Sequence, residues 1–68
     1  MSVRLRKRSL LLAGHATSVA LEPEFWTALE ALAARRGVSL PVLIARIDDD
    51  RGERPLASAC RVTALLER

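Results

Sequence analysis

Larger and smaller side chains alternate in the segment that precedes Pro23. This segment runs Thr17, Ser18, Val19, Ala20 and Leu21. Successive side chains of a β-strand point to opposite faces, so the alternation predicts a strand over residues 16–21 with one larger and more apolar face. Pro23 blocks the strand and suits the first turn of a helix, where its missing N–H has no intrahelical partner to lose.

A helical repeat of apolar side chains follows Pro23. It comprises Phe25, Trp26, Leu29, Leu32 and Ala33. Arg35 and Arg36 suit the negative end of the helix dipole, and Gly37 suits a left-handed cap. The sequence therefore predicts a helix over residues 23–36, and its two aromatic side chains are expected in the core rather than in a ligand site.

A second amphipathic helix is predicted over residues 40–49, with Ser39 as a favourable N-cap. Its apolar stripe comprises Leu40, Leu43, Ile44 and Ile47. Three consecutive aspartates follow, at positions 48–50. Neighbouring residues on a helix point in different directions, so these carboxylates would not converge on one ion, and we expect no metal site.

A third helix is predicted over residues 56–67, because Pro55 can begin it and apolar side chains again recur at helical spacing. These are Leu56, Ala59, Cys60, Thr63 and Leu66. Cys60 is the only cysteine. It suits a small buried hydrophobic position better than a reactive thiol, and a lone cysteine fits the reducing cytoplasm.

The short apolar run at residues 9–13 has two interpretations. Leu10–Leu12 can form a first strand that folds back on residues 17–21 as a hairpin, or the run can be extended and pack against a partner subunit. Ala13–Ala16 has about the right length for a hairpin loop and contains Gly14, which favours the hairpin. Both interpretations place residues 9–68 in one domain, preceded by a basic arm at residues 1–8.

The small size of the chain bears on its oligomeric state. A chain of 68 residues buries only about 60% of its unfolded surface, yet half of its residues are hydrophobic. No disulfide framework or metal site can compensate, so we expect dimerisation to complete the core. The alternatives are a loosely folded monomer and a subunit of a larger assembly.

The net charge of +3 is concentrated near the N-terminus. The basic cluster comprises Arg4, Arg6, Lys7 and Arg8. Such a cluster suits nucleic acid or another anionic surface; the alternative is a solvated arm without a ligand. The apolar run after it is too short for a signal peptide or a membrane span. We therefore expect a cytoplasmic protein without membrane contact.

The sequence contains none of the usual catalytic constellations. It has no paired acid and base, no nucleophile with its base, no Gly-rich phosphate loop and no set of metal ligands. His15 is the only histidine and has no catalytic partner nearby in the sequence. We therefore expect no enzymatic activity and no cofactor.

A strand that leads into a Pro-initiated helix, then Gly-Val-Ser at 37–39 and a second apolar helix, resembles the ribbon-helix-helix family. These are small bacterial DNA-binding proteins of the Arc and MetJ type. The run Gly-His-Ala-Thr-Ser-Val-Ala-Leu-Glu-Pro-Glu-Phe-Trp at 14–26 resembles a narrower group of short bacterial members. The resemblance implies a mostly α-helical fold with a short β-ribbon and an intertwined homodimer. The narrower group adds a C-terminal helix.

The resemblance also implies a site. In this family the strand pairs with its twin from the second subunit, and the ribbon enters the major groove of double-stranded DNA. By position, Ala16, Ser18 and Ala20 would face the bases. These small side chains imply weak base readout. The other face and the helices would form the dimer core, carried by Val19, Leu21, Trp26, Leu29, Leu43, Ile44 and Ile47.

A phosphate site at the start of the second helix is the second implied feature. In the family, backbone amides there hold a DNA phosphate, and Ser39 matches the cap. Pro41 removes one N–H, for which Arg35 or Arg36 would compensate. The favoured function is thus a homodimeric transcriptional regulator. The alternative is an adaptor that binds another protein, as an antitoxin does.

Overall fold

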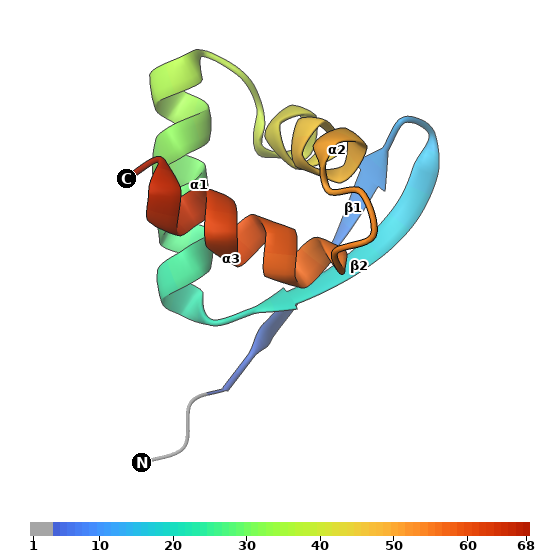
Figure 1. Cartoon of the computed structure of the whole chain (residues 1–68), viewed down its shortest axis with the longest axis horizontal. Coiled ribbons are helices and arrows are strands. Elements are labelled where there is room, and N and C mark those ends of the chain that lie inside the picture. Colours follow the sequence, from blue (N-terminus) through green and yellow to red (C-terminus); the bar gives the residue numbers. More distant parts are fainter. Residues whose placement is uncertain (1–3) are drawn as a thin grey trace.

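The computed structural model describes residues 4–68, and these form a two-stranded antiparallel ribbon followed by three helices (Figure 1). The elements are β1 (Arg6–Leu12), β2 (His15–Leu21), α1 (Pro23–Arg36), α2 (Leu40–Asp50) and α3 (Leu56–Leu66). The predicted fold class, a short ribbon with helices and an additional C-terminal helix, is confirmed. Each helix lies within one residue of the bounds expected for it.

The ribbon is a hairpin made by one chain. Its register runs from Arg6 opposite Leu21 to Leu12 opposite His15, which leaves Ala13 and Gly14 as a two-residue loop. Both loop residues have positive φ, 50° and 84°, as the type I′ turn favoured in tight hairpins requires. The hairpin interpretation is therefore correct, and its loop is shorter than the four residues that the sequence suggested.

The predicted basic arm is also shorter than expected. Of residues 1–8, the first three lie outside the described residues, and β1 already begins at Arg6. Pairing with β2 gives Arg6, Lys7 and Arg8 a partner strand. The indole Nε1 of Trp26 adds a second anchor, since it donates a hydrogen bond of 2.8 Å to the carbonyl of Arg6. Only Arg4 and Leu5 precede the strand among the described residues.

The helix ends follow the capping signals of the sequence. Gly37 has φ 67° and its N–H bonds to the carbonyls of Ala33 and Ala34, which ends α1. Ser39 Oγ accepts a hydrogen bond of 3.3 Å from the Val42 N–H and so starts α2. In α3, the last buried side chain is Ala64. Leu66, which was expected on the same apolar stripe, is 76% exposed in the last turn.

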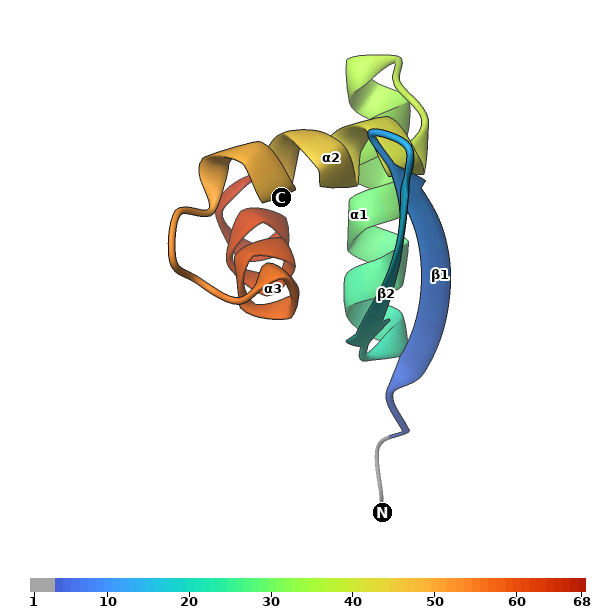
Figure 2. The ribbon, with the colours of Figure 1, turned by 90° about the vertical axis from the view of Figure 1, so that its right-hand side faces the viewer.

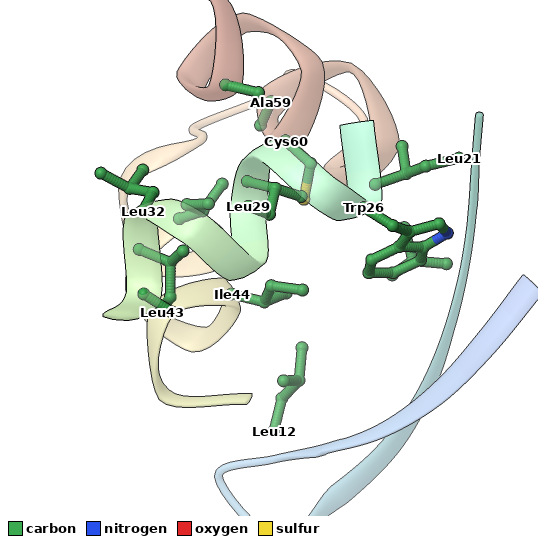
Figure 3. Close-up of a cluster of buried hydrophobic side chains, with 13 residues drawn as sticks. Leu12, Leu21, Trp26, Leu29, Leu32, Leu43, Ile44, Ala59 and Cys60 are labelled. Atoms are coloured by element: carbon green, nitrogen blue, oxygen red, sulfur yellow. The ribbon is translucent and has the colours of Figure 1, made fainter. Parts of the chain in front are cut away.

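The hydrophobic core lies between the ribbon and the helices. Figure 2 shows that the helices lie on one side of the ribbon, and its other side is open. Both strands and all three helices contribute buried side chains, with Trp26 directed from α1 toward the ribbon (Figure 3). The largest of those that are fully buried are Trp26, Leu21, Leu29, Leu43, Ile44 and Cys60.

The core closes within one chain, whereas the sequence led us to expect that a second subunit would complete it. The seven side chains assigned to a dimer core are at most 7% exposed within one chain. They are Val19, Leu21, Trp26, Leu29, Leu43, Ile44 and Ile47. The physical reason is that the chain supplies its own second strand, β1, and that α3 contacts both α1 and α2. The burial of these residues therefore does not depend on dimerisation.

Candidate nucleic-acid interface

One face of the ribbon points away from the helices. Directly opposite residues of an antiparallel pair lie on the same face. The outward pairs are Lys7 with Ala20, Ser9 with Ser18, and Leu11 with Ala16. Five of these side chains are exposed and Ala20 is partly exposed. We call these six residues the outward face.

The outward face contains the three ribbon residues that were expected to meet DNA, Ala16, Ser18 and Ala20, all from β2. It also contains three from β1 that sequence reasoning missed. The omission follows from the family pattern, in which both strands are copies of the same segment. The signal was present as an alternation along residues 7–12, in which Lys7, Ser9 and Leu11 take the odd positions, and in the turn-forming Gly14.

The outward face offers few groups that can recognise a base. Ser9 Oγ and Ser18 Oγ lie 3.4 Å apart at its centre, and Lys7 is its one charged side chain. Hydroxyl groups accept or donate and so discriminate weakly between bases, whereas Leu11 and the alanines can contact only apolar groups such as a thymine methyl. The face can therefore enter a groove, but it offers no bidentate base contact.

Arg8 is held on the other face of the ribbon. Its guanidinium carbon lies 4.7 Å from the centroid of the Trp26 ring, and its Nη1 lies 2.6 Å from Glu30 Oε1. Arg6 lies on the same face of the ribbon as Arg8, opposite Leu21, but its side chain is exposed at the end of the strand. The basic cluster is thus divided: Lys7 faces outward, Arg8 is paired, and Arg4 and Arg6 are exposed at the open end of the hairpin.

The residues of the predicted phosphate site lie at the start of α2 and at the end of α1. Ser39 Oγ serves as an N-cap. Arg35 Nη2 donates a hydrogen bond of 2.7 Å to the carbonyl of Glu67, and Arg36 Nη2 lies 2.6 Å from a carboxylate oxygen of the same residue. Both arginines therefore join the end of α1 to Glu67, the residue after α3.

Other titratable side chains have structural contacts. Burial raises the pKa of the Cys60 thiol to about 11, so the thiol is protonated at neutral pH and is a poor nucleophile. The pKa of Glu22 is lowered by a hydrogen bond from its own backbone and by one from Arg61. His15 is exposed at the start of β2.

Two further features are absent from the part of the chain that the structure describes. Residues 4–68 contain no group of histidine, cysteine, aspartate or glutamate side chains that could hold a metal ion. None of the helices in this range is long and apolar enough to cross a membrane.

Comparison with known proteins identifies the family. A model described as a ribbon-helix-helix domain matches residues 5–67. A solved structure of an uncharacterised protein from Bordetella pertussis Tohama I is 45% identical, with a TM-score of 0.79 over 94% of this chain. The chain spans 55% of that protein's length. No match was found among curated proteins. From the matched range and the hairpin followed by α1 and α2, the chain belongs to the ribbon-helix-helix domain family.

Proposed function

We propose that the chain is a DNA-binding transcription regulator of the bacterial cytoplasm that places the outward face of its hairpin in the major groove. The observation that supports this most is the outward face itself. It is exposed, carries Lys7, Ser9 and Ser18, and is fixed to the helices by the buried side chains behind it. Ribbon-helix-helix proteins typically bind DNA through a two-stranded ribbon. In this chain one subunit supplies both strands, in place of the expected pairing of β2 with its twin from a second subunit.

Binding in this proposal is mainly electrostatic. Lys7 on the ribbon, with Arg4 and Arg6 at its open end, can contact phosphates, and the net charge of the chain is +3. Phosphate contacts supply affinity and register but little sequence information. The serines and alanines of the outward face add little discrimination between base pairs. We therefore expect weak sequence preference and strong salt dependence.

Charge reversal on the outward face tests this proposal. Lys7→Glu should weaken binding to a random duplex at low salt, measured by fluorescence anisotropy. Arg68→Glu makes the same change of charge outside the ribbon and is the matched control. Ser18→Ala should change neither affinity nor sequence preference appreciably. Equal losses of affinity in Lys7→Glu and Arg68→Glu would show that binding depends only on the net charge of the protein. If the parent protein binds no DNA at low salt, the proposed function is excluded.

A homodimer is part of the proposal because the family typically acts as a dimer on DNA. The core closes within one chain, so we expect the dimer to dissociate into folded monomers. Light scattering should give a dimer mass at micromolar concentration, while the thermal midpoint should depend only weakly on concentration. A monomer mass throughout this range would remove the dimer from the proposal.

A second candidate function, binding of another protein, is favoured by one observation. Leu11 on the outward face is 66% exposed and Leu5, just before β1, is 53% exposed. Exposed aliphatic side chains on a ribbon suit a protein partner better than a phosphate backbone. Leu11→Ser separates the two: it should leave electrostatic DNA binding intact but should abolish capture of a protein partner through this face.

A further inference from the structure

An open pocket of about 360 Å³ lies among the helices. It is formed by α2, by the segment that joins α2 to α3, by α3 itself and by the end of α1. No residue of the ribbon lines it, so it shares no side chain with the outward face. Its volume falls in the range of small-molecule sites.

The pocket has apolar walls and a charged rim. Ile47, Ala59 and Val62 provide apolar surface beside the hydroxyl of Thr63. The charged lining residues are Arg36, Arg46, Arg51, Arg54, Asp50 and Glu67. The lining thus has four arginines against two carboxylates, and Asp48, which does not line the pocket, offsets one further positive charge through its ion pair with Arg51. The rim remains positive and therefore favours an anionic ligand.

Two of the four arginines are already engaged. Arg36 lies 2.6 Å from the Glu67 carboxylate. Arg51 Nε lies 2.6 Å from Asp48 Oδ1, and its Nη1 donates a hydrogen bond of 2.9 Å to the carbonyl of Arg54. These contacts tie the rim together and fix the loop between α2 and α3.

The side chains of the other two lining arginines, Arg46 and Arg54, have no such contacts in the described part of the chain. Within residues 4–68, the guanidinium groups of Arg46 and Arg54 make no hydrogen bond or ion pair with the protein. Each carries a planar set of donors that matches the oxygens of a phosphate. They lie on the rim of a pocket whose apolar wall is formed by Ile47, Ala59 and Val62.

We propose that this pocket binds a small phosphate monoester with a short apolar group. The phosphate would accept hydrogen bonds from Arg46 and Arg54, and the apolar group would contact Ile47, Ala59 and Val62. The negative charge of the monoester is opposite to that of the two arginines that have no ion pair within residues 4–68. The site stands apart from the ribbon, so the proposal does not depend on DNA binding.

Butyl phosphate is a suitable probe, followed by NMR on the intact chain. It should shift the amide signals of Val62 and Thr63 saturably, whereas butanol, which lacks the charge, should not. Inorganic phosphate, which lacks the apolar group, should bind more weakly. Arg46→Gln and Arg54→Gln should each weaken binding by roughly tenfold, since each removes one charged donor group.

The control variant is Arg68→Gln, which removes one positive charge next to Glu67 but does not line the pocket. It should leave the affinity for butyl phosphate within about twofold. Equal weakening by Arg68→Gln and Arg54→Gln, equal affinities for butyl phosphate and inorganic phosphate, or shifts confined to the ribbon would overturn the proposal. A dispersed spectrum from each variant shows that it is folded, and loss of DNA binding alone would leave this site unaffected.

Discussion

At the scale of single residues, Ala13 occupies the least favourable backbone position in the chain. Its φ of 50° is the one positive value at a non-glycine residue within the described range. For a residue with a Cβ, the left-handed region costs about 1–2 kcal/mol. Asparagine tolerates this region, and Asn-Gly is the preferred pair for a type I′ turn. The hairpin is therefore formed in spite of its first loop residue.

Ala13→Asn should stabilise the protein by about 0.5–1 kcal/mol, because it relieves this strain and leaves the core unchanged. Urea unfolding followed by circular dichroism measures the effect. Ala16→Asn is the control, since the same side chain placed in β2 should not stabilise an extended backbone. A loss of stability in Ala13→Asn would show that the turn is of another type.

The ion pair between Glu22 and Arg61 gives a second prediction at this scale. Their side-chain atoms lie 3.0 Å apart and join the start of α1 to α3. The folded pKa of Glu22 is lowered from 4.5, so its contribution to stability is present above that value and is lost as pH falls through the folded pKa.

Glu22→Gln should therefore reduce the difference in unfolding free energy between neutral pH and about pH 3. Urea titrations at the two pH values measure this difference. Glu24→Gln removes a carboxylate that is exposed in the first turn of the same helix, and it should keep the pH dependence of the parent protein. The same pH dependence in Glu22→Gln and the parent would show that this ion pair does not contribute.

At the scale of elements, the helices and residues 10–12 of β1 could be predicted from the sequence, but residues 6–9 of β1 could not. Gly37, Ser39 and Pro55 mark helix ends by local chemistry, and the apolar repeats between them are regular. In β1, the inward position 8 is filled by an arginine. Its place in the fold depends on Trp26 and Glu30, which are distant in the sequence. A local pattern cannot show such contacts, so residues 6–8 resembled a solvated arm.

The candidate site follows the same division. The two-residue period separates Ser18 and its neighbours from the larger side chains of the strand, and the family resemblance then implied that they face outward. Lys7 and Ser9 join them only because β1 pairs with β2. The contacts of Arg35 and Arg36 depend on where α3 ends, which the family pattern does not specify. Residues with local partners were therefore predictable, and those with distant partners were not.

Helix α2 offers a matched pair of substitutions that tests its packing. Ile44 is 0% exposed, whereas Val42 on the same helix is 42% exposed. Ile44→Ala should cost about 2–5 kcal/mol, as for a buried large-to-small change, and Val42→Ala should cost about 1 kcal/mol or less. Chemical denaturation of the two variants provides the comparison. Similar losses in both would contradict the orientation of α2.

At the scale of the whole molecule, five of the basic residues predicted to contact DNA fall into two groups. Arg4, Arg6 and Lys7 are exposed at or near the ribbon, whereas Arg35 and Arg36 contact Glu67 at the end of α3. The first group lies beside the outward face, and the second is already engaged with Glu67. In the proposed function, DNA contact therefore falls to the open end of the hairpin.

The salt dependence of DNA binding tests this assignment. For B-DNA, each phosphate that a protein neutralises adds about 0.9 to the steepness of log K against log salt. Arg4→Gln combined with Lys7→Gln should therefore flatten the slope by about 1.8 on any duplex. Arg35→Gln combined with Arg36→Gln changes the net charge equally and should leave the slope nearly unchanged, once circular dichroism shows that the fold is retained. If the second pair flattens the slope and the first does not, the end of α1 contacts DNA and the outward face of the hairpin does not.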